Sequence, residues 1–192
     1  MSGYKRPIPE SYWVEPGCFL AGEYPGYLQD EQLRQRINSF LDVGIDTFID
    51  LTDPNELPPY LPVLKEQAGY YDVNIHYKRF TITDHTVPTS ETMQAIIDEI
   101  DSSLATGRKI YVHCWGGIGR TGTTVGCYLV RHGRSGQQAL AQLAEWWQDV
   151  PKSRIWPHTP ETQRQMEFIL NWDDSPLPLG APFRDEKGQG EG

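Results

Sequence analysis

The chain has 192 residues, 38% of them hydrophobic and 11% aromatic, which is enough for one packed core and too short for two ordinary domains. Its 26 acidic residues outnumber 17 basic ones, and the formal net charge of -9 disfavours nucleic acids and anionic membranes as partners. No segment approaches the roughly 20 apolar residues that span a bilayer. We therefore expect a cytoplasmic protein without membrane association, and we expect it to be a monomer.

The first half of the chain alternates helical and strand patterns. Apolar residues at helical spacing predict a helix over 30–43, which Gly44 would end in a left-handed conformation. The apolar run over 45–51 predicts a buried strand directly after it. A short helix over 60–67 and a strand over 71–79 are predicted to follow.

The clearest amphipathic pattern lies in the middle of the chain. Over 91–104 the apolar residues fall on one helical face, and Thr89 or Ser90 could cap the start of this helix. Gly107 stands where the helix would end.

The remaining segments continue the alternation. They predict a strand over 109–113 and helices over 121–132, 135–150 and 160–172. Ser135 and Gln138 could form a capping box on the second of these helices. For the last helix we expect Thr159 as the cap and Pro160 at the first helical position.

This order of elements predicts an α/β fold. A central, mainly parallel sheet would be covered by helices on both faces, because each parallel strand needs a crossover connection. We expect one domain over 13–172, preceded by an N-terminal extension over 1–12. The segment 173–192 is rich in proline, glycine and charge, which predicts a flexible tail.

Three cysteines occur at unrelated spacings, namely Cys18, Cys114 and Cys127. They form neither a CxxC pair nor a cluster with histidine, so we expect reduced thiols, no structural metal site and no cofactor. Cys18 and Cys127 are interpreted as small buried apolar residues.

Cys114 stands in a different setting, the glycine-rich segment HCWGGIGRT between a predicted strand and a predicted helix. Three glycines allow such a loop to turn its backbone N–H groups inward, and the helix that follows adds the positive end of its dipole. The segment therefore predicts an anion site. The residues expected to bind the anion are Trp115, Gly116, Gly117, Ile118, Gly119 and Arg120.

The same loop supplies a nucleophile. A helix N-terminus and a neighbouring cation lower a cysteine pKa, so we expect Cys114 to be a thiolate, with Arg120 holding two phosphate oxygens. Thr121 could hydrogen-bond the sulfur when it departs, and His113 is expected to fix the loop geometry. Cleavage of a phosphate ester also needs a proton donor outside the loop. Asp84 in TITDHTVP is our choice.

Rival acids remain in the chain, namely Asp53, Asp72 and Glu91, and Asp84 could instead form a local turn. Lys152 and Arg154 could approach the rim of the site, although a solvated surface is the simpler interpretation of both.

HCWGGIGRTG resembles the HC(x5)R(S/T) loop of protein tyrosine phosphatases, in particular the compact dual-specificity branch. FTITDHTVP is similar to that family's acid loop, and PETQRQMEFIL to the segment whose glutamine positions water, which implies Gln165, with Gln163 as second choice. With CFLAGEYPG as the first strand and turn, the resemblance covers 14–172.

The resemblance implies a hydrolase that acts on phosphotyrosine, and on phosphoserine or phosphothreonine, through a phosphocysteine intermediate. The partner would be a phosphorylated protein or a small phosphate. Inositol phosphates, nucleotides, phosphoinositides and RNA 5′ ends remain open substrates, although the loop lacks the lysines of phosphoinositide-selective members. A phosphate-binding pseudoenzyme and a rhodanese-like sulfur transferase are the alternatives from other classes.

Overall fold

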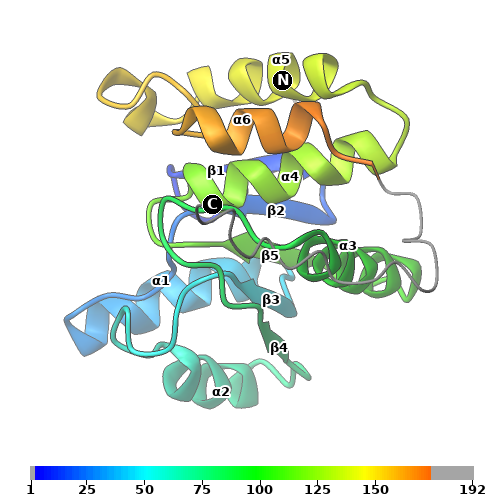
Figure 1. The fold of residues 1–192 in the computed structure, drawn as a ribbon. Coiled ribbons are helices and arrows are strands. Elements are labelled where there is room, and N and C mark those ends of the chain that lie inside the picture. The colour runs from blue at the N-terminus through cyan, green and yellow to red at the C-terminus, as the bar shows by residue number, and fades with distance from the viewer. Residues whose placement is uncertain (1–2, 174–192) are drawn as a thin grey trace, which may run out of the picture.

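A five-stranded sheet forms the centre of the molecule (Figure 1). The computed structural model describes residues 3–173. The strands are β1 (Ser11–Glu15), β2 (Phe19–Gly22), β3 (Thr47–Asp50), β4 (His76–Arg79) and β5 (Ile110–His113), in the spatial order β1-β2-β5-β3-β4. β1 pairs antiparallel with β2, and the other pairs are parallel. The predicted mainly parallel α/β sheet is confirmed.

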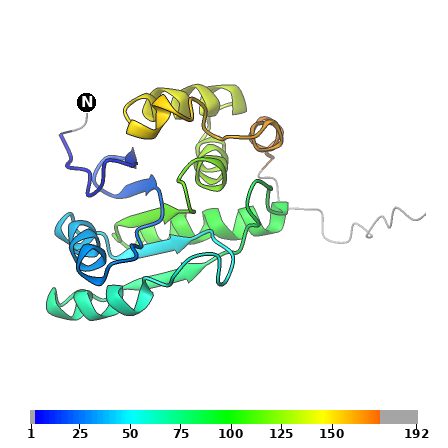
Figure 2. The same ribbon diagram turned by 90° about the vertical axis from the view of Figure 1, so that its left-hand side faces the viewer.

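Helices cover both faces of this sheet (Figures 1 and 2). They are α1 (Asp30–Asp42), α2 (Leu61–Tyr70), α3 (Ser90–Ala105), α4 (Gly119–Arg131), α5 (Gly136–Gln148) and α6 (Gln163–Leu170), with a 3-10 turn over Pro151–Arg154. α1 and α2 pack on one face, and α3 and α4 on the other, with α5 and α6 against α4. No helix within residues 3–173 is long and apolar enough to cross a membrane.

Side-chain alternation along β5 explains the two cores. Ile110 and Val112 pack in the cluster under α3 and α4, whereas Tyr111 packs with α1 and α2. All three side chains are fully buried. A short strand that is apolar on both faces is what a central parallel strand requires.

Local capping signals were partly correct. Thr89 caps α3, and Ser135 and Gln138 form the predicted capping box of α5. The predicted start of the last helix is wrong: α6 begins at Gln163, and Thr162 caps it in a box with Gln165. The Thr159 hydroxyl instead donates to the carbonyl of Ile118, 41 residues away in sequence.

Two other boundaries and one strand also differ from expectation. β4 begins at His76 rather than 71, because α2 extends to Tyr70 and a turn follows in which Asp72 has a φ of 52°. α4 begins at Gly119, two residues before the predicted start. β1 was not predicted and lies partly within the expected extension over 1–12. The expected tail over 173–192 lies outside the described residues from 174 onward.

The carboxyl ends of four strands align at one edge of the sheet. In register, Gly22 and Asp50 both pair with His113, and Asp50 also pairs with Arg79. Connections that leave this edge therefore meet above it, which is where open α/β sheets place their sites. Cys114 is the next residue after β5.

Candidate active site

The loop from Cys114 to Ile118 joins β5 to α4, and four of its five carbonyl groups accept hydrogen bonds from groups around the loop. The pairs are Cys114 O with His113 Nδ1 (3.2 Å), Trp115 O with Tyr24 N (2.8 Å), Gly116 O with Lys152 Nζ (3.1 Å) and Ile118 O with Thr159 Oγ1 (2.9 Å). Carbonyls held outward leave the amide groups to face the loop centre. The predicted donor nest is thus supported from three sides of the fold.

Gly117 is where the loop most needs glycine. Its φ is +74°, and a Cβ there would lie 2.5 Å from the carbonyl carbon of Gly22 at the end of β2. A side chain would therefore be strained and would collide with backbone. This close approach sets the loop directly on the edge of the sheet.

Cys114 lines a cavity of about 320 Å³. Its residue is 3% exposed. The cavity is lined by Asp84, His85, Cys114, Trp115, Gly116, Ile118, Gly119, Lys152, Trp156 and Glu161. The sulfur is therefore buried but lies at the wall of an open cavity, as the predicted nucleophile requires. Within residues 3–173, Cys18, Cys114 and Cys127 are not joined by disulfide bonds.

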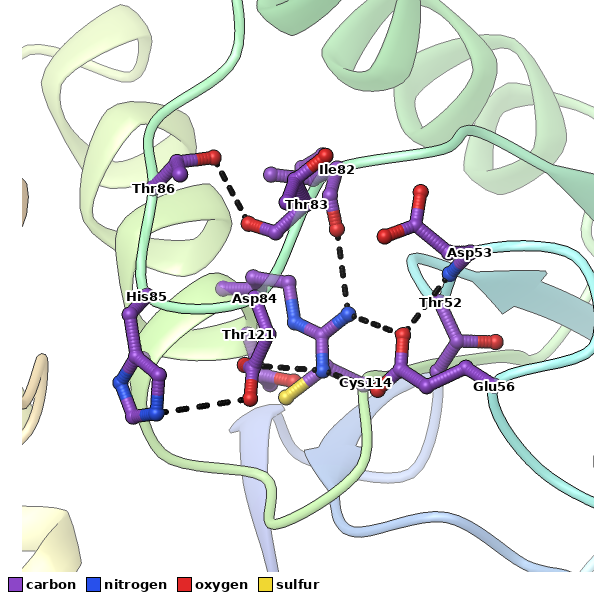
Figure 3. Close-up of polar contacts among 12 residues, drawn as sticks. Thr52, Asp53, Glu56, Ile82, Thr83, Asp84, His85, Thr86, Cys114 and Thr121 are labelled. Carbon is purple, nitrogen blue, oxygen red and sulfur yellow. Dashed lines mark hydrogen bonds and ion pairs between the residues drawn. The ribbon is translucent and has the colours of Figure 1, made fainter.

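Arg120 is held by carboxylates on two neighbouring loops. Its guanidinium donates to both oxygens of Glu56 (2.8 and 2.7 Å) and to the carbonyl of Ile82 (3.1 Å). The Asp84 carboxylate lies 3.0 Å away. Figure 3 shows the side chains of Glu56, Asp84 and Cys114 gathered in one place, with dashed lines that mark the contacts of Glu56 and Asp84. The guanidinium side chain is 1% exposed.

These neighbours keep the Arg120 guanidinium protonated. Burial lowers its pKa, but hydrogen bonds to Glu56 and the charges of Cys114 and Asp84 outweigh burial and raise it. Within residues 3–173 its buried Nε–H has no hydrogen-bond partner. A buried donor without an acceptor costs free energy, which a phosphate oxygen would recover. Arg120 is therefore prepared to bind one more anion.

Glu56 was missed in the sequence. It lies between β3 and α2, 64 residues before its partner, and its hydrogen bonds with Arg120 lower its pKa despite partial burial. The available signal was its place: an acid in the segment DPNELPPY, which leaves the carboxyl end of a buried strand.

Asp84 stands in the connection from β4 to α3 and lines the cavity, with 38% of its side chain exposed. The rival acids lie elsewhere: Asp72 in the turn after α2, Glu91 in the first turn of α3, and Asp53 near Glu56, to which its amide donates. The geometry therefore favours Asp84 as the proton donor.

His113 and Thr121 support the loop from below. His113 is fully buried, its Nε2 lies 2.7 Å from the Tyr60 hydroxyl, and burial lowers its pKa. A buried imidazole bonded through both ring nitrogens fits the expected structural role. The Thr121 hydroxyl donates to the carbonyl of Gly22 at 3.4 Å. Its expected bond to the departing sulfur stays a prediction.

The comparisons with known proteins agree with this geometry. The family model described as Swiss Army Knife protein, DSP-PTPase phosphatase domain, matches residues 9–167. The chain belongs to the dual-specificity and tyrosine phosphatase family. The expectation drawn from HCWGGIGRTG is confirmed at the level of family and fold.

Several relatives share this phosphatase domain. Protein tyrosine phosphatase domain-containing protein 1 of Mus musculus is 27% identical over 66% of this chain and 19% of its own length. Dual specificity protein phosphatase CDC14B of Mus musculus is 32% identical over 94% of this chain and 34% of its own length. The active-form crystal structure of Tk-PTP aligns with a TM-score of 0.63 and 25% identity, covering 84% of this chain and 94% of that one. The chain thus spans about a fifth of the first curated relative and most of a solved phosphatase.

Gln165 lies close to the phosphatase loop, but its amide is engaged. It is fully buried, its Oε1 accepts from Thr162 N (3.1 Å) and its Nε2 donates to the carbonyl of Thr86 (3.2 Å). A Cβ at Gly119 would lie 2.7 Å from Nε2. Its expected role in positioning water stays a prediction, and Gln163 pairs instead with Glu167 on the exposed face of α6.

Two further residues beside the phosphatase loop were not singled out in the sequence, namely His85 and Glu161. His85 has a φ of +58°, and its ring lies between Glu161 and Asp84. The three residues offer ligand atoms within 4.8 Å of one another, a spacing that would permit a metal ion without requiring one. The histidine beside the acid in TITDHTVP was the available signal.

Proposed function

We propose that the protein hydrolyses phosphate monoesters through a phosphocysteine intermediate at Cys114. The observation that supports this most directly is the arrangement around the cavity. Cys114 lines it, in a loop four of whose carbonyls are bonded to surrounding groups, beside a guanidinium whose buried Nε–H has no partner among residues 3–173. Such a site favours a tetrahedral dianion and a thiolate together.

In the first step the Cys114 thiolate attacks phosphorus while the bond from phosphorus to the ester oxygen breaks. The phosphoryl oxygens lie in the amide nest and on Arg120, and Asp84 donates its proton to the departing oxygen. The Asp84 carboxylate contacts the same guanidinium that would hold phosphate. A phosphate bound to Arg120 therefore displaces the Asp84 carboxylate toward the departing ester oxygen.

In the second step water attacks phosphorus and the sulfur departs as a thiolate, which releases inorganic phosphate. The helix dipole of α4 and Arg120 stabilise that thiolate. Glu56 keeps the guanidinium fixed in both steps, because its two oxygens bind the two terminal nitrogens.

For the substrate we propose an aryl phosphate, that is phosphotyrosine, ahead of phosphoserine and phosphothreonine. Two exposed indoles, Trp115 and Trp156, line the cavity and would contact a ring. The alternative is a small soluble phosphate such as an inositol phosphate or a nucleotide. The solved Siw14 core, a PP-IP phosphatase, has this fold at 18% identity, and Lys152 at the cavity could receive a second phosphate.

Activity of wild type and Cys114→Ser on a phosphotyrosine peptide, a phosphoserine peptide and an inositol phosphate tests the proposal. We expect wild type to prefer phosphotyrosine, Cys114→Ser to lose turnover while it still binds vanadate or phosphate, and Cys18→Ser to behave as wild type. Hydrolysis retained by Cys114→Ser would exclude the mechanism. A faster reaction with the inositol phosphate would move the substrate to the small-phosphate class.

A further inference from the structure

Glu161 brings a second carboxylate into the candidate active site. It lies in the connection before α6, lines the same cavity as Cys114 and has a side chain that is 25% exposed. Its Oε1 lies only 2.3 Å from the position of a Cβ at Gly119. This oxygen therefore rests against the backbone of the phosphate loop, where α4 begins.

Glu161 is connected to the acid loop through His85. The His85 ring has Nδ1 3.3 Å from Glu161 Oε1 and Nε2 3.5 Å from Asp84 Oδ2. The backbone of His85 holds a φ of +58°, which costs free energy for a residue with a side chain. The two carboxylates thus face one cavity from two loops, with an imidazole between them.

The carboxylates of Asp84 and Glu161 have different charged neighbours. Asp84 lies 3.0 Å from the Arg120 guanidinium. Burial raises the pKa of Glu161, Asp84 raises it further, and the charges of His85 and Arg120 only partly oppose this. A carboxylate with a raised pKa is the stronger base.

The residue expected to handle water is poorly placed to accept a proton. Both ends of the Gln165 amide have protein partners, and an amide does not take up a proton near neutral pH. Glu161 lies beside that amide, because both side chains crowd the same face of Gly119.

We propose, on the basis of the proposed function, that Glu161 is the general base for hydrolysis of the phosphocysteine. A water molecule between Glu161 and the phosphoryl group forms the new oxygen–phosphorus bond. Its proton passes to the Glu161 carboxylate, the sulfur–phosphorus bond breaks, and its electron pair returns to Cys114 as thiolate. Asp84 serves the first step, and Glu161 the second. His85 positions both side chains.

Pre-steady-state kinetics with an aryl phosphate separate the two steps. We expect Glu161→Gln to keep the rapid first release of about one equivalent of the phenol and then to turn over about 10- to 100-fold more slowly than wild type. Mass spectrometry of the quenched variant should show phosphate accumulated on Cys114. Glu167→Gln, an exposed acid on α6 in the same segment, is the matched control and should behave as wild type.

The retained burst shows that the variant is folded and that its first step is intact. A Glu161→Gln enzyme with the wild-type steady rate, or one whose burst itself is slowed with no accumulated phosphocysteine, would overturn the assignment of Glu161 and leave the phosphatase proposal standing. A wild-type protein with neither burst nor turnover on any phosphate ester would exclude both the assignment of Glu161 and the proposed phosphatase function.

Discussion

Asp50, the last residue of β3, accepts a dense set of hydrogen bonds at the edge of the sheet beside the candidate active site. Its fully buried side chain accepts from the Thr52 amide and hydroxyl (2.9 and 2.6 Å), the Tyr77 hydroxyl (2.7 Å) and the Arg79 guanidinium (2.7 Å). Burial raises its pKa, but the charge of His113 and the bonds from Thr52 and Arg79 outweigh burial and lower the pKa to about 2. Asp50→Asn should therefore destabilise the fold.

The magnitude follows from the difference between the ordinary pKa of 3.8 and the value of about 2. At roughly 1.4 kcal/mol for each pKa unit, the ionised Asp50 carboxylate contributes about 2 kcal/mol to the free energy of unfolding. Because the folded-state pKa is the lower one, this contribution is fully present well above pH 4, falls to about half at pH 3 and disappears below pH 2.

Urea unfolding of wild type and Asp50→Asn, followed by circular dichroism at pH 7 and pH 3, measures this contribution. The difference between the two proteins should be about 2 kcal/mol at pH 7 and about half of that at pH 3. Asp98→Asn removes an exposed carboxylate paired with Arg131 and serves as control, with little change expected at either pH. A difference that is absent at pH 7, or that does not shrink at pH 3, would refute this account of Asp50.

Three substitutions test the loops around the cavity. Asp84→Asn should lower turnover on alkyl or peptide phosphates far more than on esters with good leaving groups, and equal losses would move the proton donor elsewhere. Glu56→Gln should lower kcat/KM by about 10-fold or more, because the Arg120 guanidinium loses a charged bidentate partner, and an unchanged kcat/KM would contradict that role. Gly117→Ala should lower the melting temperature and abolish activity. Gly133 is the control, because it is also at positive φ but has open space around its Cβ, so Gly133→Ala should cost only the backbone strain. Similar effects of the two substitutions would contradict the close approach of Gly117 to β2.

Features specified by neighbouring residues could be predicted from the sequence. The capping box of Ser135 and Gln138 depends on residues three apart, and the loop from Cys114 to Arg120 contains its nucleophile and clamp within one short segment. The mainly parallel sheet followed from the alternation of strands and helices.

Features that depend on distant partners could not be predicted. Glu56 binds a guanidinium 64 residues later, and no local pattern marks that pairing. Thr159 and Pro160 carry a local signal for a helix start, but the Thr159 hydroxyl is used by the Ile118 carbonyl across the fold, so the helix begins at the next capping residue. His85 and Glu161 are far apart in the sequence. They come together only in the folded chain, where the acid loop and the segment before α6 line one cavity.

Rapid acid quenching during turnover of an aryl phosphate, followed by peptide mass spectrometry, tests the central claim most directly. Phosphate on the Cys114 thiol, formed and lost at rates that match turnover, is the predicted result. Steady turnover with no phosphate on Cys114, or with phosphate on another side chain, would contradict it.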